Sequence, residues 1–180
     1  MDRMKKLIED AENFFLEKFP ESLQYLQKEM QEKKYREIIK NQYEKMREQA
    51  EEKIIVYFGL SFLYSSLYDK SYEIVFTMLN ENFYLDTNPI ESFVEIPVFF
   101  EHYEKNMEYT MWRLGKAMGN IQPFEENEIR KICAFYYYAA IYEFFRSLSK
   151  NMCLENEKVI FFCGMYHGEA IQWTNRKANE

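Results

Sequence analysis

Cys163 and His167 are the two residues in this chain whose types and spacing best suit metal ligation. They stand four residues apart, which would put both side chains on one face of a helix. A site also needs a third and usually a fourth ligand, and no paired motif supplies one. The Glu-x-x-His pattern of helical di-iron proteins is absent, because Phe99 and Gly164 occupy the position three residues before each histidine. We therefore expect a packed thiol at Cys163, a surface or hydrogen-bonded histidine at His167, and no bound metal or other cofactor.

A second group with possible chemistry is the set of carboxylates Glu101, Glu104 and Glu108. On a helix they share one face around His102 and Lys105, and buried carboxylates there could do general acid–base work. Charged side chains are rarely buried without a partner, so we expect an ordinary solvated face. The chain also lacks a nucleophile-elbow Gly-x-Ser-x-Gly turn and a phosphate-binding P-loop. We predict no catalytic residue, and an enzyme is the least favoured class.

Tyrosines are concentrated around a single carboxylate, Glu143, between residues 136 and 143. Buried tyrosine hydroxyls and buried carboxylates both require hydrogen-bond partners, and a small-molecule pocket lined by rings would have this composition. A plain aromatic core would have it too, and aromatic residues at helical spacing are usually packing residues. If the pocket exists, its candidate ligand-binding residues are Glu143, Tyr137, Tyr138, Tyr142 and Trp112. We expect Glu143 to be partly buried with a tyrosine or basic partner.

The segment from residue 127 to residue 150 would position these side chains. Between Ala134 and Phe145 its only charge is Glu143, and it contains no glycine or proline. A helix that is apolar all round is normally buried on most of its circumference. The pattern predicts a central helix around which the other elements pack.

Residues 1–50 read as a charged, amphipathic helical arm or as outer helices. Apolar residues at helical spacing predict a helix over 2–18, and Pro20 is expected to end it and begin the next one. Residues 21–58 have no internal breaker, so they form either one long helix or two helices with a break near Lys33. Such an arm could pair with a partner or with a second copy of the chain.

Residues 54–79 are strongly apolar and predict two helices joined by a turn at 69–71. They resemble one tetratricopeptide-type helical hairpin, with residues of suitable size at Gly59, Phe62, Ser71 and Val75, while Met78 is larger than the small residue that the pattern prefers there. No second copy follows at the repeat length, and such solenoids need several repeats. The resemblance therefore implies the geometry of a helical hairpin and not membership of that family.

The remaining segments complete an all-α prediction. We expect a loop over 80–88, a helix start at Asn88-Pro89, and either a kink or a new helix at Pro97. A helix over 98–118, a break over 119–123 and a last helix over 155–173 follow. The prediction is a single domain, residues 1–180, of about seven or eight helices. Residues 51–173 would form an aromatic-rich core bundle and residues 174–180 a frayed tail.

Charge is distributed unevenly along the chain, whose net charge is −7. Residues 54–128 carry 4 basic and 12 acidic groups. Nucleic-acid binders need a basic surface, so this function class is excluded. The acidic third is either a solvated surface or a docking face for a basic partner.

The cysteines and the absence of long apolar runs indicate the cellular compartment of the protein. The three cysteines, Cys133, Cys153 and Cys163, are odd in number and fit no disulfide framework. The longest uncharged run, 54–68, has 15 residues, fewer than the roughly 20 that span a bilayer. We expect a cytoplasmic protein with no membrane partner.

These observations favour a non-enzymatic interaction or regulatory protein, such as an adaptor, inhibitor or immunity-type factor. Its partner would be another protein, with a basic face, or a second copy bound through the N-terminal helices. The alternative is a helical small-molecule-binding domain with a pocket beside Glu143, like the ligand half of a bacterial regulator without its DNA-reading half. That alternative rests on fold-level analogy.

Overall fold

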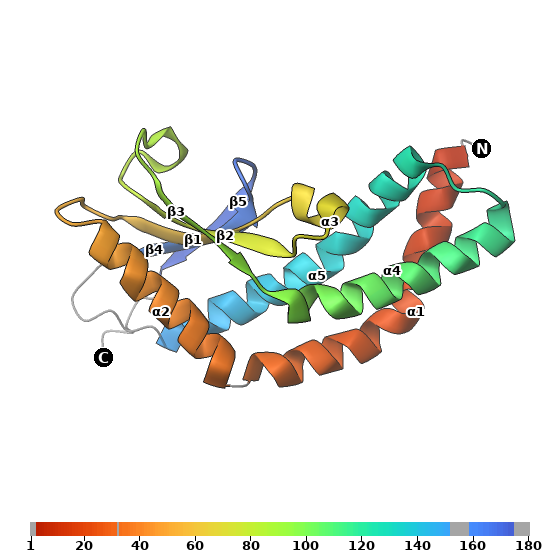
Figure 1. Ribbon diagram of the computed structural model, residues 1–180, viewed down its shortest axis with the longest axis horizontal. Coiled ribbons are helices and arrows are strands. Elements are labelled where there is room, and N and C mark those ends of the chain that lie inside the picture. The colour runs from red at the N-terminus through yellow and green to blue at the C-terminus, as the bar shows by residue number, and fades with distance from the viewer. Residues whose placement is uncertain (1–2, 32, 152–158, 175–180) are drawn as a thin grey trace. The chain divides into compact units, whose positions relative to one another are not determined.

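The computed structural model describes residues 3–31, 33–151 and 159–174, and in these residues the protein has an α/β fold (Figure 1). The prediction of an all-α bundle with seven or eight helices is wrong. The described residues form five α-helices, one 3₁₀ turn and a five-stranded mixed sheet. In chain order the elements are α1 (Arg3–Gln31), α2 (Lys33–Gln49), β1 (Tyr57–Phe62), α3 (Ser65–Asp69), β2 (Glu73–Leu79), η1 (Phe83–Leu85), β3 (Ile90–Glu95), α4 (Pro97–Met118), α5 (Pro123–Asn151), β4 (Ile160–Met165) and β5 (Ala170–Thr174).

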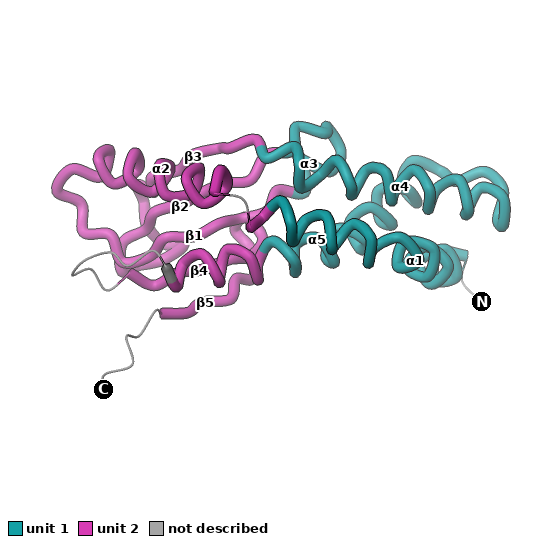
Figure 2. The backbone as a smooth tube through the Cα atoms, turned by 90° about the horizontal axis from the view of Figure 1, so that it is seen from below, with its two compact units in different colours: residues 1–29, 64–72, 96–141 teal, residues 30–63, 73–95, 142–180 magenta. Residues whose placement is uncertain are grey.

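The chain divides into two compact units (Figure 2). Unit 1 comprises Met1–Glu29, Tyr64–Tyr72 and Ile96–Ile141, and is helical throughout its regular elements. Unit 2 comprises Met30–Leu63, Glu73–Glu95 and Tyr142–Glu180, and holds α2 and the sheet. Whether the whole chain folds as a single cooperative domain stays a prediction.

The sheet of unit 2 has the strand order β3-β2-β1-β4-β5. β1 pairs antiparallel with β2 and parallel with β4, while β3 and β5 pair antiparallel with β2 and β4. The parallel pair needs a long crossover, and the chain between β3 and β4 supplies it with α4 and α5. In the described part of the chain, β3 and β5 are therefore the two edges of the sheet.

Both faces of the central strands are covered. On one face, Phe58 and Phe76 stack at 5.7 Å and meet Phe145 of α5, and Tyr43 of α2 lies edge-on to Phe58 at 5.0 Å. We call this the helix face. On the opposite face, the ring of Phe83 in η1 lies 5.1 Å from that of Phe162. We call this the loop face, because residues 80–88 fold over it (Figure 1).

Gly59 of β1 is required by this arrangement. A β-carbon at position 59 would lie 2.4 Å from the ring of Phe162, which stands beside it in register on β4. A glycine inside a strand commonly marks such a close approach. The ring of Phe162 thus sits directly over the backbone of β1 and is fully buried.

Unit 1 is organised around rings from three helices. Phe15 of α1 lies 6.2 Å from Tyr103 of α4 and 5.9 Å from Tyr137 of α5. The Asn106 side-chain amide donates a hydrogen bond to the Tyr137 hydroxyl at 3.0 Å, and the Ser22 hydroxyl donates to the Asn106 side-chain oxygen at 3.2 Å. The polar side chains of Ser22, Asn106 and Tyr137 are therefore paired with one another.

Pro20 lies inside α1, so the prediction that it ends a helix is wrong. Proline removes one backbone donor and disfavours helix continuation. Here the residues on either side are fixed by tertiary contacts, since Phe19 packs 5.4 Å from Tyr137 and Ser22 bonds Asn106. Tertiary packing overrides the local signal. α1 ends at Gln31 and α2 begins at Lys33, in agreement with the alternative that placed a break near Lys33.

Four predicted helices contain β-strands instead. The tetratricopeptide-like hairpin over 54–79 is β1, the short α3 and β2; the helix start at Asn88-Pro89 precedes β3; and the last helix over 155–173 is the β4–β5 hairpin in its described part. β1 and β2 are buried on both faces, so their sequences are short and mainly apolar, with no charged residue on either face after Glu73. Short runs of this kind do not distinguish strand from helix.

Other predicted boundaries are confirmed. A new helix begins at Pro97 and ends at Met118, and the next helix spans residues 123–151 across the segment expected to be central. The predicted tail falls mostly outside the described residues. Among the residues with described structure, no helix is long and apolar enough to cross a membrane.

Candidate functional site

The surface with the most distinctive chemistry is the outer edge of β3, which we call the acidic edge and define as Glu91, Phe93 and Glu95. The register pairs Glu91 with Thr77, which is itself opposite Gly59, so these alternate residues of β3 point to the loop face. Phe93 is 54% exposed, and Glu95 is exposed and directly opposite Glu73 of β2. An exposed aromatic thus stands between two carboxylates.

The carboxylates of this region are not balanced by basic residues nearby in sequence. Residues 73–95 contain Glu73, Glu81, Asp86, Glu91 and Glu95 and no lysine, arginine or histidine. In the same unit, α2 carries six basic and three acidic residues, but it packs on the helix face. The acidic edge points away from it, toward the loop face.

Two of these carboxylates hold the structure in place. Asp86 accepts hydrogen bonds from the Lys53 ammonium at 2.7 Å and from the backbone N–H groups of Asn80 and Asn88 at 2.8 and 3.0 Å. Burial alone would raise the pKa of Asp86, but these donors hold it below its usual value. Glu91 accepts a hydrogen bond from the Tyr166 hydroxyl at 3.0 Å. The loop and β3 are thereby fixed against the strands they flank.

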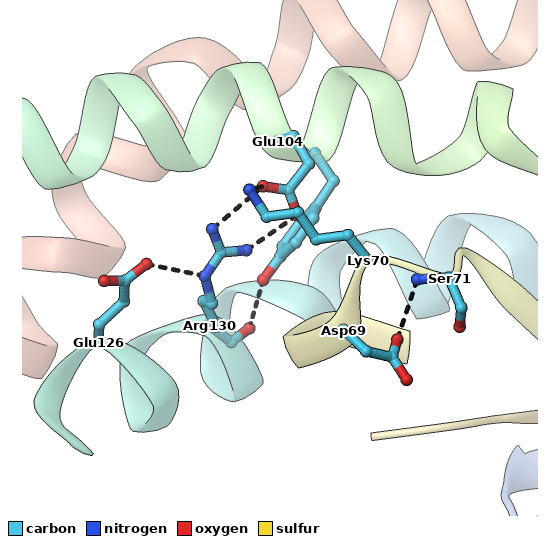
Figure 3. Close-up of polar contacts among 7 residues, drawn as sticks. Asp69, Lys70, Ser71, Glu104, Glu126 and Arg130 are labelled. Carbon is cyan, nitrogen blue, oxygen red and sulfur yellow. Dashed lines mark hydrogen bonds and ion pairs between the residues drawn. The ribbon is translucent and has the colours of Figure 1, made fainter. Parts of the chain in front are cut away.

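A second polar cluster lies inside unit 1 (Figure 3). The Arg130 guanidinium donates two hydrogen bonds to Glu104, at 2.8 and 3.1 Å, and a third to Glu126 at 3.0 Å. Lys70, held in a left-handed backbone conformation at the end of α3, places its ammonium 3.5 Å from Glu104. Tyr103 donates its hydroxyl to the Arg130 backbone carbonyl at 2.8 Å.

This cluster has the properties of a structural ion network. The side chains of Glu104 and Arg130 are only 11% and 9% exposed. Burial lowers the pKa of Arg130, but the hydrogen bonds and charge of Glu104 more than offset it and raise that pKa overall. The expectation of a solvated carboxylate face is wrong for Glu104, whereas Glu101 and Glu108 are exposed. Because both oxygens of Glu104 already face cations, the carboxylate is poorly placed to accept a substrate proton.

Tyr137 and Tyr138 are both buried in unit 1. The Tyr137 hydroxyl is engaged by Asn106, and burial raises its pKa to about 12. Burial also raises the pKa of Tyr138, whose ring lies edge-on to Phe135. Trp112, in the same unit, is 54% exposed, with the Lys116 ammonium 3.8 Å from its ring centre.

Tyr142 and Glu143 belong to unit 2. Tyr142 lies edge-on to Trp173 at 5.6 Å. The side chain of Glu143 is 68% exposed, and its nearest basic partner is Arg146 at 3.9 Å. The expected basic partner is present, but the expected partial burial is wrong, because this position of α5 faces solvent. Ligand binding by these five aromatic and acidic residues stays a prediction.

Cys163 and His167 do not share a helix face. Cys163 is buried on β4, where burial raises its thiol pKa, while His167 lies in the turn before β5 at φ 53°. The packed thiol is as expected, and Cys133 is likewise buried and free. Cys153 lies outside the described residues. Within those residues, no three histidine, cysteine or acidic side chains are grouped as metal ligands.

Sequence reasoning missed the acidic edge and the partner of Glu104. The short segment between Pro89 and Pro97 contains Ile90, Phe93 and Val94, residue types that favour strands, and this was a usable strand signal. The Glu104–Arg130 pair joins residues 26 apart on different helices, and no local pattern indicates it. No protein-family model, curated protein or solved structure matches this chain.

Proposed function

We propose that this protein is a non-enzymatic interaction protein that binds a basic protein partner through the acidic edge of β3. The observation that supports this most strongly is the combination at one sheet edge of an exposed Phe93 and two flanking carboxylates. Aromatic residues supply most of the apolar contact at protein interfaces, and surrounding charges select the partner and accelerate its encounter.

The local charge selects the kind of partner. Residues 73–95 carry five acidic and no basic groups, so an acidic protein or a nucleic acid would be repelled there. Edge strands also present unpaired backbone donors and acceptors, which natural proteins usually protect. Carboxylates on this edge discourage contact with a second acidic copy while leaving the edge available to a basic partner.

The test is capture of partners from extract of the source cells with immobilised protein. Wild-type protein should retain one or more basic proteins at about 50 mM salt and release them at about 500 mM, where the screening length falls several-fold. The variant Phe93→Thr/Glu95→Gln should lose them. Both positions are exposed, and threonine suits a strand, so the fold should be retained.

A matched control separates this surface from general acidity. Glu101→Gln/Glu108→Gln removes two exposed carboxylates from α4 in unit 1 and leaves β3 unchanged. It should retain the same partners as the wild type. Equal retention by all three proteins, or loss with the control variant alone, would refute the assignment of the surface.

A further inference from the structure

The spacing of residues on β3 points to a specific form for the bound segment. Building on the proposed function, we infer that the partner contributes an extended strand that pairs with β3 as the sixth strand of the sheet, carrying basic, apolar and basic residues at alternate positions. The occupant is thus a short basic β-strand rather than a helix or a folded basic face.

The first argument is the position of β3 in the sheet. β2 pairs with one side of β3, and no described strand pairs with the other. An unpaired strand edge binds extended peptides through main-chain hydrogen bonds, while alternate side chains provide selectivity. The other described edge, β5, carries no charged residue and therefore offers no comparable selectivity.

The second argument is the period of the side chains. Glu91, Phe93 and Glu95 are two residues apart, so all three point to the loop face along a single strand. A strand added beside β3 would place its own alternate residues directly across from them. Lysine or arginine would lie opposite each glutamate, with an apolar or aromatic residue opposite Phe93.

The third argument concerns the residues between. Ile90, Ser92 and Val94 point to the helix face, on which α2 packs and contributes six basic against three acidic residues. Basic residues at the intervening positions of the added strand would find no acidic partner on β3 there, and the net positive charge of α2 disfavours them. Small polar or acidic residues would be tolerated, so the motif alternates basic residues with neutral or acidic ones.

A second copy of this chain does not satisfy the same requirements. Pairing β3 with β3 of another copy would bring Glu91 and Glu95 close to the same glutamates of the partner. Like charges directly across a strand pair are destabilising. The acidic edge therefore discourages self-pairing and favours a strand of opposite charge.

The experiment measures the affinity of two synthetic peptides of identical composition for the full chain, by fluorescence anisotropy in about 50 mM salt. The patterned probe is Ser-Lys-Thr-Phe-Thr-Lys-Ser, whose symmetry makes the result independent of strand direction. The control is Lys-Lys-Thr-Phe-Ser-Thr-Ser, in which a lysine falls on the wrong face, since a one-residue shift reverses the side of a strand. We expect the patterned probe to bind about fivefold or more tightly.

Variants test the register. Glu95→Lys should weaken the patterned probe about fivefold to tenfold, because an attractive cross-strand pair becomes a repulsive one. Replacing one probe lysine with glutamate should restore binding to this variant. Glu108→Lys, which changes the net charge equally on α4, should bind like the wild type. Glu95→Lys places a base opposite Glu73, so it should not disrupt the strand pair.

The outcomes separate this inference from the proposed function. Equal binding of both peptides, weakened equally by Glu95→Lys, would overturn strand addition and leave a basic partner at the acidic edge standing. If neither peptide binds, or if Glu108→Lys weakens binding as much as Glu95→Lys does, both the strand-addition inference and the proposed function are overturned. A wild-type dimer in sedimentation that Phe93→Thr dissociates, and that Glu95→Lys strengthens by relieving the repulsion between glutamates, would identify a second copy as the occupant and also overturn the inference.

Discussion

The ion network around Glu104 yields a prediction whose size can be worked from the structure. Arg130→Met removes the two guanidinium hydrogen bonds to Glu104 and leaves this carboxylate, whose side chain is 11% exposed, with Lys70 at 3.5 Å. Loss of one partner from a buried pair typically costs about 3–5 kcal/mol. Because Lys70 remains, we expect Arg130→Met to lower the free energy of unfolding by about 2–3 kcal/mol.

The double variant Arg130→Met/Glu104→Leu tests the cause. Replacing a buried pair with apolar residues of similar volume is often neutral, so the double variant should lie within about 1 kcal/mol of the wild type. This would make the two substitutions strongly non-additive, as expected for residues in contact. The assay is urea unfolding followed by circular dichroism at 222 nm, with the slope compared between proteins.

Lys131→Met is the control on the same helix. Lys131 pairs with Glu128 at 2.8 Å, but both side chains are substantially exposed, so the substitution should leave the unfolding midpoint almost unchanged. If Arg130→Met is no more destabilising than this control, or if the double variant is the least stable of the three, the cluster does not act as a buried ion network.

Three further predictions concern separate parts of the fold. Gly59→Ala should lower the free energy of unfolding in urea by about 1–3 kcal/mol, because the added β-carbon would meet the ring of Phe162. Gly115→Ala on α4 has open space and should be stabilising, so equal effects of the two substitutions would contradict the packing described. Asp86 has a depressed pKa, so its contribution is complete above the unfolded value of about 3.9 and is lost as pH falls through the lower folded value. Asp86→Asn should therefore lower the melting temperature at pH 6 and match the wild type near pH 2; a constant difference would be inconsistent. Burial raises the pKa of the Cys133 thiol to about 12 and also raises the pKa of the Cys163 thiol. Neither thiol should therefore react with Ellman's reagent at pH 8 until the protein is unfolded, and rapid labelling of either one in the native protein would contradict their burial.

The long helices could be predicted from the sequence because their signals are local. The segment that became α5 lacks glycine and proline after Pro123, and it is too long for a strand. Pro97 begins α4 at the position that proline favours, and Gly119 follows its last residue. These features do not depend on which other elements pack nearby.

The sheet could not be predicted in the same way because its inner strands lack alternation. β1 and β2 are buried by helices on one face and by residues 80–88 on the other, so neither face carries the charged residues that would mark a half-exposed strand, apart from Glu73 at the start of β2. β4 and β5 gave a better signal in Gly164, inside β4, and Gly168, in the turn between the two strands. A β-carbon at Gly164 would lie 2.1 Å from the backbone oxygen of Glu169, so this glycine marks a close backbone approach that a helix would not require.

The candidate site was foreseen in its charge and missed in its geometry. Composition alone left two alternatives for the acidic middle third, a solvated surface or a docking face for a basic partner. Its useful part, Glu91 to Glu95, becomes a single surface only because β3 is a strand at the edge of a sheet. Reading Asn88-Pro89 as a helix cap removed the period of two that brings Glu91, Phe93 and Glu95 to the same face.

Hydrogen–deuterium exchange of the captured complex tests the account's central claim most directly. When the basic partner binds, the backbone amides of residues 90–95 should exchange more slowly than in the free protein, and those of α4 should be unchanged. Protection confined to α1 and α2, or to the helices of unit 1, with β3 exchanging as in the free protein, would contradict binding at the acidic edge.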